Sequence, residues 1–345
     1  MALIVMADDG IEFDGVTMRE RALGGAESAF VNLAEALAAR GHRVAVRNNC
    51  PHPGLHWGVE WGPLAAGFPA TADLYIANRG DRLILKMAGR ARRTVFWLHN
   101  PARYLLKLRY LWKLAWQRPA MVFAGPAHLA TYPPWAPGGE RIAIPLGVDD
   151  LFLKARPAQA APKPRAIFTS NPLRGLAWLL ELWAARIHPG LPGAELHVFA
   201  GPAPYGAYGA AKAAAMRAVL ERARALADRG VVLREPVPRA ALVDELRQSR
   251  VMLYRGDPGE SFCLAVAEAQ ALGVPAVVER IGATPERVID GETGFVAPDD
   301  NAFARAAARL LVDDELWRRQ HQAALARQRG WGWPQAAAAF EALIP

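Results

Sequence analysis

Two glutamates, Glu260 and Glu268, stand eight residues apart on either side of an apolar stretch of helix-forming residues. Because Pro258 and Gly259 break the chain just before this stretch, the spacing predicts a helix that begins near Phe262. A helix start offers unpaired backbone N–H groups and the positive end of the helix dipole, and both favour an anion. Glu268 lies about 9 Å farther along the axis at 1.5 Å per residue. The pattern favours a ligand with a diphosphate at the helix start and hydroxyl-bearing rings on either side, as in an activated nucleotide sugar.

The first free N–H groups of the predicted helix belong to Phe262, Cys263 and Leu264. An alternative is an ordinary amphipathic helix with one exposed glutamate near each end, because two glutamates at this spacing are common by chance. The apolar strand expected at 275–278 and the turn at 281–286 favour the ligand site over that alternative.

Residues 259–286 resemble the Glu-x7-Glu signature of retaining glycosyltransferases of the GT-B fold, especially those of glycosyltransferase family 4. The resemblance covers nearly the whole chain, and its motifs are strongest in the second half. It implies that Glu260 is a catalytic residue that holds hydroxyl groups of the donor sugar, and that Glu268 binds the ribose. It also implies that the amides of residues 262–264 contact the donor phosphates.

Length and composition agree with a two-domain protein. A chain of 345 residues is too long for one ordinary core. Cys50 and Cys263 match no metal or redox spacing, which indicates a reducing, cytoplasmic setting. The apolar run Met1–Met6 has the length of a buried strand rather than of a secretory signal. No apolar stretch approaches the roughly 18 residues that a membrane span requires.

Strands and helices are expected to alternate along the chain, which predicts α/β domains with parallel sheets and helices on both faces. A proline- and alanine-rich linker at 155–165 separates two such series. The expected strands are 3–6, 44–46, 74–77, 95–98, 121–123, 142–144, 166–169, 195–200, 231–234, 251–254 and 275–278. The expected helices are 26–39, 103–118, 176–187, 210–228, 240–248, one that contains Glu268, and one that ends at 343.

The resemblance then implies the GT-B layout, in which two Rossmann-like domains face each other across a cleft. Residues 1–150 form the acceptor-side domain, and 151–330 form the domain that binds the nucleotide-sugar donor. The final helix, within 331–345, crosses back to the first domain.

In the first domain, Gly24 and Gly25 open a helix, and glycine lets backbone approach a ligand closely. A plain turn is the alternative. The pair resembles the family's glycine loop, which touches the donor phosphates, and it is not the G-x-G-x-x-G fingerprint of a dehydrogenase. Glu27 is assigned to helix capping and to complementing the helix dipole, and contact with the substrate is the alternative. His99 follows the strand 95–98 at its carboxyl end, where it resembles the family's catalytic cleft histidine; a structural histidine is the alternative.

In the second domain, Arg174 and Gly175 stand where many family members have a Lys-Gly pair. A fixed cation there would stabilise the leaving diphosphate, and arginine binds phosphate bidentately. The chain departs from the family just upstream, where it has Thr169 or Ser170 in place of a second basic residue. Either these hydroxyls and the helix start complete the phosphate site, or Arg255 does.

Arg234 and Val237 lie in a loop that matches the base-binding loop of the family. Base recognition there is often through backbone groups, so these side chains do not distinguish uridine from guanosine. No Asp-x-Asp motif occurs in the sequence. We therefore expect neither a metal nor another cofactor.

The positive charge is concentrated between Arg79 and Arg118, where eleven Lys or Arg residues face a single acid, Asp81. This segment carries +10, whereas the whole chain carries +8. Basic side chains mixed with Leu and Tyr suit an anionic membrane surface. A soluble acceptor and nucleic acid are alternatives, but no nucleic-acid-binding motif is present, so no nucleic-acid partner is expected.

Within this segment, residues 103–118 predict one amphipathic helix. Its apolar face is expected to pack on the sheet, and its opposite face mixes basic residues with Leu106, Tyr110 and Leu114. The expected core face consists of Tyr104, Leu105, Leu108, Leu111, Trp112, Ala115 and Trp116.

The sequence thus predicts a cytoplasmic, metal-independent, retaining glycosyltransferase that moves a sugar from a UDP- or GDP-sugar to an acceptor. A lipid-linked saccharide of cell-envelope or polysaccharide synthesis is one candidate acceptor, and the protein would then be peripheral on the inner face of the membrane. The alternatives are another GT-B enzyme, such as a sugar-nucleotide epimerase or an inverting transferase, and a nucleotide-binding homologue without catalysis.

Overall fold

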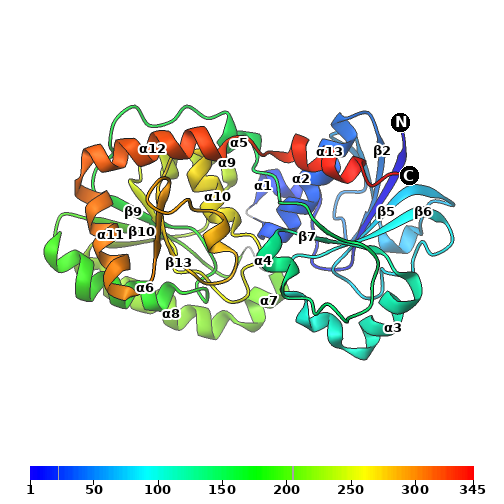
Figure 1. Ribbon diagram of the computed structural model, residues 1–345, viewed down its shortest axis with the longest axis horizontal. Coiled ribbons are helices and arrows are strands. Elements are labelled where there is room, and N and C mark those ends of the chain that lie inside the picture. Colours follow the sequence, from blue (N-terminus) through cyan, green and yellow to red (C-terminus); the bar gives the residue numbers. More distant parts are fainter. Residues whose placement is uncertain (22, 204–205) are drawn as a thin grey trace. The chain divides into compact units, whose positions relative to one another are not determined.

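The computed structural model describes residues 1–21, 23–203 and 206–345, and the chain divides into two compact units (Figure 1). The first unit contains 1–147 together with 331–345, and the second contains 148–330. The last helix therefore belongs to the first unit, as the resemblance implied. The proline- and alanine-rich residues 155–164 have no regular structure and lie within the second unit.

The first unit is built on a sheet of eight strands in the order β3-β4-β2-β1-β5-β6-β7-β8. All neighbours are parallel except β3 and β4, which form an antiparallel pair that the sequence analysis did not predict. The strands are β1 (Leu3–Asp8), β2 (Arg43–Asn48), β3 (Gly54–His56), β4 (Val59–Pro63), β5 (Ala72–Asn78), β6 (Ala91–Trp97), β7 (Ala120–Phe123) and β8 (Arg141–Ala143).

Helices cover both faces of this sheet because alternate strand residues point to opposite sides. On one face α2 (Gly25–Ala39) packs with α13 (Trp333–Glu341), and the rings of Trp97 and Phe340 lie 5.2 Å apart (Figure 1). On the other face Tyr75 and Phe96 belong to a core cluster with η2 (Ala102–Leu106) and α3 (Leu108–Gln117). The shorter helices are α1 (Thr17–Glu20), η1 (Leu64–Ala66) and α4 (Pro126–Leu129).

The single helix predicted over 103–118 is wrong, because the chain is extended at Lys107 between η2 and α3. This break rotates α3 relative to the uninterrupted pattern, so Tyr110 and Leu114 face the core. Four of the seven residues expected on the core face are thereby exposed. The large apolar side chains of α3 that are exposed are Leu108, Trp112 and Trp116.

The basic residues between 79 and 118 do not form one continuous charged surface. Five of the eleven have acidic partners, most of which come from outside the segment. The pairs are Arg79 with Asp8 and Glu27, Arg92 with Asp73, Arg93 with Glu140, and Arg109 and Lys113 with Asp81.

The second unit contains six parallel strands in the order β11-β10-β9-β12-β13-β14. Counted within the unit this is 3-2-1-4-5-6, the Rossmann order. The strands are β9 (Arg165–Phe168), β10 (Glu195–Phe199), β11 (Val231–Arg234), β12 (Val251–Leu253), β13 (Ala276–Glu279) and β14 (Gly294–Ala297).

Helices of the second unit connect these strands, and α6 passes directly into the π-helical turn η3. The helix expected over 210–228 is divided into α7 and α8. The elements are α5 (Asp150–Leu153), α6 (Leu176–Leu182), η3 (Trp183–Ile187), η4 (His188–Gly190), α7 (Gly206–Ala211), α8 (Ala213–Ala225), η6 (Ala227–Arg229), α9 (Arg239–Arg247), α10 (Leu264–Ala271), η7 (Thr284–Glu286), α11 (Asp300–Val312) and α12 (Asp314–Gln328).

None of the helices in the described part of the chain has the length and apolar character needed to cross a bilayer.

Candidate functional site

In the second unit, the polar residues of interest follow β9 and β12, the two adjacent strands at which the strand order reverses. In open parallel sheets such a switch point, at the carboxyl ends of the strands, is the usual ligand site. The loop after β9 carries Arg174, and the loop after β12 carries Tyr254 and Glu260. Topology therefore brings these three side chains to the same edge of the sheet.

Glu260 is held by three hydrogen-bond donors. Arg174 Nη1 donates to Oε2 at 2.8 Å, and the Tyr254 hydroxyl donates to the same oxygen at 2.6 Å. The backbone amide of Cys263 donates to Oε1 at 3.1 Å. Although burial opposes the charge of Arg174, the Glu260 carboxylate raises the pKa of this guanidinium. Burial, together with Glu260, raises the pKa of Tyr254, so its hydroxyl stays a donor.

The start of α10 differs from the prediction, since the helix begins at Leu264 rather than near Phe262. Cys263 precedes it with φ +69°, and its amide is bonded to Glu260. The carboxylate thus satisfies one of the amides that a helix start leaves unpaired. The Cys263 amide, predicted for the phosphates, is therefore already occupied. Burial raises the pKa of the Cys263 thiol well above its usual value, and Glu260 adds to this shift.

The second guanidinium of this edge belongs to Arg255. Gly175 has φ +78°, and a Cβ placed there would lie 3.4 Å from the Arg255 Cβ, so the two loops are adjacent. Arg255 Nε donates to Glu279 Oε2 at 2.9 Å, and its guanidinium lies 4.7 Å from the Trp178 ring. Ser170 is half-buried in the loop that leads to Arg174. Both arginines proposed for the phosphates therefore already bind one carboxylate each.

Glu268 lies in α10 and is buried. Arg239, the first residue of α9, donates to Glu268 Oε1 at 2.5 Å through Nη2, and its Nε lies 3.6 Å from Asp149 Oδ2. Burial raises the pKa of Glu268, and the Arg239 guanidinium opposes that shift. Sequence reasoning found Glu268 by its spacing but missed Arg239 and Asp149, which stand far from it in the chain.

The predicted base-binding residues lie in the segment that leads to Arg239. Arg234 ends β11, is exposed, and lies 6.0 Å from the Phe199 ring. Val237 is half-buried in the loop between β11 and α9. Arg239 directly follows this loop. Its hydrogen bond to Glu268 therefore links the loop predicted to bind the base to the glutamate predicted to bind the ribose.

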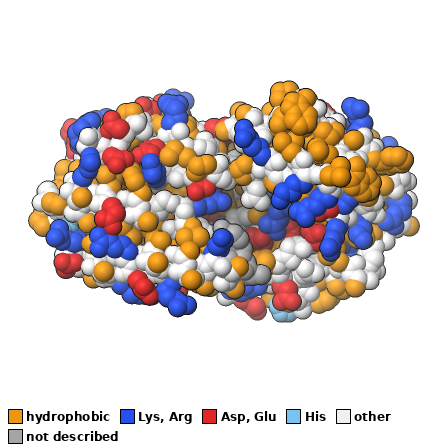
Figure 2. Space-filling view, turned by 90° about the horizontal axis from the view of Figure 1, so that it is seen from below, with side chains coloured by type: hydrophobic (Ala, Val, Ile, Leu, Met, Phe, Trp, Pro, Cys, Tyr) orange, Lys and Arg blue, Asp and Glu red, His pale blue; other side chains and the backbone are white. Residues whose placement is uncertain are grey.

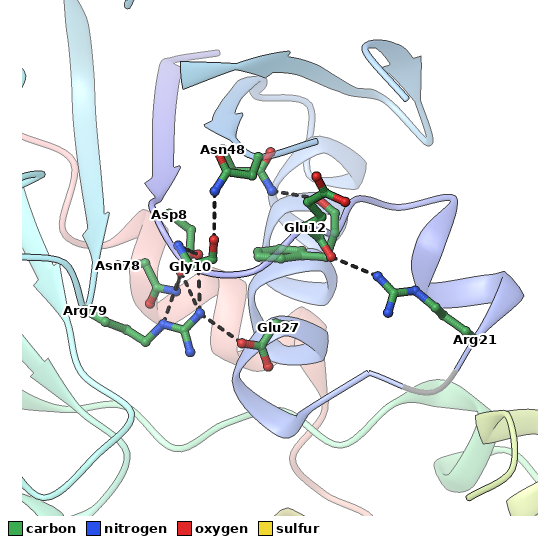
Figure 3. A network of polar contacts seen from close by, with 10 residues as sticks. Asp8, Gly10, Glu12, Arg21, Glu27, Asn48, Asn78 and Arg79 are labelled. Atoms are coloured by element: carbon green, nitrogen blue, oxygen red, sulfur yellow. Dashed lines mark hydrogen bonds and ion pairs between the residues drawn. The ribbon is translucent and has the colours of Figure 1, made fainter. Parts of the chain in front are cut away.

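In the first unit, a buried charged network occupies the corresponding switch point, between β1 and β5 (Figure 3). The Asp8 carboxylate accepts from Asn78 Nδ2 at 2.5 Å, from Arg79 Nε at 3.1 Å and from the Gly10 amide at 2.8 Å. Arg79 Nη2 also donates to Glu27 Oε1 at 3.0 Å. Although burial opposes its charge, Asp8 and Glu27 raise the pKa of Arg79. The sequence signal for this network was the position of Asp8 and Arg79, two charged residues at the ends of apolar strands.

The glycine pair lies at the start of α2, where Gly24 is the N-cap and Gly25 the first helical residue. Glu27 stands in the first turn, where its charge complements the helix dipole as predicted. Its ion pair with Arg79 was not predicted, and it ties the start of α2 to the end of β5 (Figure 3).

His99 is buried two residues beyond the end of β6, and its ring lies 4.4 Å from the Trp97 ring. Burial lowers the pKa of His99 well below its usual value, and the charges of Arg79 and His128 add to this shift. The ring is therefore neutral at pH 7. His128, which sequence reasoning missed, accepts from the Ala124 amide at Nδ1, and its Nε2 lies 2.8 Å from the Asn100 carbonyl. These bonds assign the Nε2–H tautomer to His128, which fixes the backbone next to His99.

Among the described residues, no three His, Cys, Asp or Glu side chains are grouped so that they could hold a metal ion.

Residues 163–313 match the family described as glycosyl transferases group 1. D-inositol 3-phosphate glycosyltransferase of Streptomyces griseus subsp. griseus is 38% identical over 106 residues, which are 30% of this chain and 22% of the relative. The enzyme of that name from Corynebacterium glutamicum (strain R) is 35% identical over 111 residues, 32% of this chain and 26% of the relative. The matched stretches thus span about a quarter of these relatives.

Several solved structures share the architecture of the whole chain. Sucrose-phosphate synthase from Thermosynechococcus elongatus has a TM-score of 0.77 and 19% identity over 99% of this chain and 98% of that one. Anabaena Alr3699/HepE, solved in complex with UDP and glucose, has a TM-score of 0.73 and 15% identity over 99% of each chain. AviGT4, a glycosyltransferase involved in avilamycin A biosynthesis, has a TM-score of 0.66 and 18% identity over 100% of this chain and 97% of that one. The fold is GT-B, and the predicted resemblance to glycosyltransferases of family 4 is confirmed.

Proposed function

We propose that this protein is a retaining glycosyltransferase that transfers a sugar from a nucleotide diphosphate sugar, UDP- or GDP-linked, to a saccharide or lipid-linked saccharide. The observation that carries the proposal is the contact of Glu260 with Arg174 and Tyr254 at the switch point of the second unit. This edge lies within residues 163–313, which match the group 1 glycosyltransferases. Structures of Anabaena Alr3699/HepE contain UDP or UDP-glucose, which supports a nucleotide-sugar donor for this chain.

In this proposal Glu260 binds hydroxyl groups of the donor sugar. Its carboxylate has about four lone-pair positions, so the three bonds observed leave room for a sugar hydroxyl. Arg174 and Tyr254 fix the orientation of the carboxylate before the donor arrives. A preoriented group needs little rearrangement during the reaction, which is how enzymes gain electrostatic stabilisation.

Arg174 has a second task, because the diphosphate leaves with negative charge that grows in the transition state. A guanidinium has five N–H donors, and one N–H on Arg174 Nη1 is used in the hydrogen bond to Glu260. The other donors of Arg174 are proposed to bind the leaving phosphate, with Arg255 beside it. Ser170, the amides of Phe262 and Leu264, and the pair Gly24–Gly25 are the further contacts that the resemblance implies. The reaction is proposed to need no metal, because the two guanidinium groups stabilise the leaving group.

Glu268 is proposed to accept hydrogen bonds from the ribose, with Arg239 as its positioning residue. Without a counterion a buried carboxylate takes up a proton and becomes a poorer acceptor. Arg239 favours the ionised form, and its contact with Asp149 limits where its guanidinium can lie. Arg234 and Val237 are proposed to flank the base, and His99 to act beside the donor sugar as a neutral ring.

The proposal is tested by thermal unfolding and turnover with UDP, GDP, ADP, TDP and their sugars. A bound nucleotide should stabilise the protein by about 2.7 kcal/mol at a hundredfold excess over Kd. Product stereochemistry, read by NMR at the new anomeric carbon, tests retention, and activity in EDTA tests metal independence. Glu260→Gln should lose turnover, whereas Glu181→Gln, which removes an exposed carboxylate bonded to Arg222, should not.

Three outcomes would contradict parts of the proposal. If no nucleotide raises the melting temperature, the donor site is assigned wrongly. If nucleotides bind but no donor sugar is consumed with any acceptor or with water, the protein is a nucleotide-binding homologue. Inversion at the anomeric carbon, or epimerisation of the donor, would indicate another GT-B activity.

A further inference from the structure

The first unit exposes four large apolar side chains that belong to one surface. Leu108, Trp112 and Trp116 occupy one side of α3 at helical spacing, and they are 77%, 50% and 80% exposed. Trp135 is 73% exposed, and it lines the same pocket as Ala115 of α3. We call these four residues the tryptophan face. Contiguous exposed apolar side chains on a folded domain indicate a contact surface rather than an incidental feature.

The tryptophan face is held rigidly from beneath. Tyr110 and Leu114 anchor α3 in the core of the first unit. The segment that carries Trp135 is fastened by Arg141, whose guanidinium also lies 4.9 Å from the Tyr132 ring. Arg141 donates to the carbonyl oxygens of Pro133, Pro134 and Ala136 at 3.0, 3.0 and 2.8 Å. Trp135 is therefore presented to solvent by a fixed backbone.

Exposed basic residues surround this face. Arg103, Lys107 and Arg118 have no acidic partner among the residues that the structure describes, and Arg109 lies 3.7 Å from Asp81 while remaining 60% exposed. Residues 100–118 contain no Asp or Glu. Figure 2 shows hydrophobic side chains beside a group of Lys and Arg side chains on the side of the first unit seen from below, where α3 lies in Figure 1.

Lys113 is a different case, although it belongs to the same helix. Its ammonium group donates to Asp81 Oδ2 at 2.7 Å and to the Asp81 carbonyl at 3.0 Å. Its charge is therefore neutralised within the first unit, and it anchors α3 rather than facing outward.

A pocket of about 440 Å³ opens beside the tryptophan face, between the end of α3 and the segment that carries Trp135. Arg118 and Arg141 both line it. Arg141 is engaged by backbone carbonyl groups, whereas Arg118 is exposed at the helix end, where its φ is +46°. A small anionic headgroup would fit the size and the charge of this hollow.

We propose that the tryptophan face docks the first unit on an anionic lipid bilayer, with the indole rings at headgroup depth and Arg103, Lys107, Arg109 and Arg118 against the anionic lipids. Indole rings favour the bilayer interface because they combine an apolar body with an N–H donor. The exposed leucine favours lipid over nucleic acid, because an aliphatic side chain offers no surface for base stacking. A fluid bilayer also accepts side chains that project separately around a hollow, which a rigid partner would have to match in shape.

The inference does not rest on the proposed glycosyl transfer, so each can fail alone. It is tested by sedimentation of the full chain with phosphatidylglycerol/phosphatidylcholine vesicles and with pure phosphatidylcholine vesicles, over a series of salt concentrations. Wild-type protein should bind the anionic vesicles, and the binding should weaken as salt rises. Vesicles with brominated acyl chains should quench its tryptophan fluorescence.

Two triple variants separate the apolar and the charged contributions. Trp112, Trp116 and Trp135 changed to Ser should abolish both sedimentation and quenching. Arg103, Lys107 and Arg118 changed to Gln should lower vesicle affinity on the order of a hundredfold, because each basic residue near an anionic surface contributes about fivefold. The matched control replaces three exposed arginines of the second unit, Arg217, Arg224 and Arg305, by Gln and should lower affinity far less.

Circular dichroism and donor turnover are measured for every variant. Binding by the tryptophan triple variant at the wild-type level, or wild-type protein left in the supernatant at low salt, would overturn the inference while leaving the proposed activity intact. Wild-type protein could instead self-associate or bind nucleic acid, with the tryptophan triple variant alone losing that interaction. This result would assign the tryptophan face to that partner and would also overturn the inference.

Discussion

Both units place charged side chains at the switch point of the strand order, but they use them differently. In the first unit Arg79 lies between two carboxylates, Asp8 and Glu27, and the network is buried. In the second unit Arg174 bonds one carboxylate, Glu260, through one nitrogen and is about one third exposed. In the first network the arginine is paired with two carboxylates of the protein, whereas in the second it is paired with one and is more exposed. A shared position in a fold therefore does not imply a shared role.

The comparison predicts that stability depends most on the first network. Arg79→Met should lower the free energy of unfolding by about 3–5 kcal/mol, because it leaves Asp8 and Glu27 without a counterion in a buried site. Urea unfolding at pH 7 measures the change. Arg43→Met is the control, since its pair with Glu60 is exposed and should contribute no more than about 1 kcal/mol. Equal losses in the two variants would end the distinction between the two networks.

Turnover, by contrast, should depend on the second network. If the proposed function holds, Arg174→Ala should lower kcat on the order of a hundredfold, with a smaller change in donor Kd, because charge on the diphosphate peaks in the transition state. Single-turnover kinetics and donor titration measure the two quantities. Arg255→Ala, measured in parallel, shows which guanidinium stabilises the leaving diphosphate. A near-normal rate in Arg174→Ala together with a slow rate in Arg255→Ala would assign that role to Arg255.

The sequence identified the elements well where they are regular. Most of the parallel strands of both sheets follow from short apolar runs, and α2 begins within one residue of its predicted start. The parallel strands β4 and β14 were not predicted. The short antiparallel strand β3 was missed, because its three exposed or half-buried residues Gly54–His56 carry no periodic apolar signal. The break at Lys107 was missed for the opposite reason, since the helical pattern runs through it without a glycine or proline.

Site residues were predictable where spacing carries information, and not where topology does. Glu260 and Glu268 stand out because eight residues separate them across the predicted start of a helix. Tyr254, Arg239 and Asp149 carry no motif. Tyr254 bonds Glu260 within the loop after β12, and the start of α9 brings Arg239 to Glu268 and Asp149. The start of α10 shifted because the Glu260 side chain bonds a backbone amide, a competition that spacing alone does not reveal.

A third test concerns the proposed ribose contact of Glu268 in the second unit. Glu268→Ala should weaken nucleotide binding by about 1.5–3 kcal/mol, the usual contribution of hydrogen bonds to a charged group. Arg239→Met should weaken it in the same direction, because the buried Glu268 then favours its protonated form. Isothermal titration with the nucleoside diphosphate measures both. Unchanged affinity in a folded Glu268→Ala variant would contradict the ribose role.

Lowering the pH should destabilise the first unit through its buried histidines. Burial lowers the pKa of both His99 and His128, so the unfolded chain takes up protons near pH 6.5 that the folded unit does not. Stability is therefore full above that pH and is lost as the pH falls, by at most about 1.4 kcal/mol between pH 7.5 and 5.5 for each such histidine. Urea unfolding of His128→Asn and wild type over this range measures the difference. Parallel curves for the two proteins would contradict it.

Helix α13 belongs to the first unit but is synthesised last, so this unit cannot complete its core until the whole chain has been made. The first unit needs Phe340 on its Trp97 face, and the Trp331 indole donates to the Pro145 carbonyl at 3.1 Å. At about 5–20 residues per second, residues 1–147 emerge from the ribosome roughly 10–40 s before the helix that completes their core. Residues 148–330 can close first, although they are made second. The apolar surface that α13 covers, including the Trp97 ring, therefore stays exposed until the last residues are made.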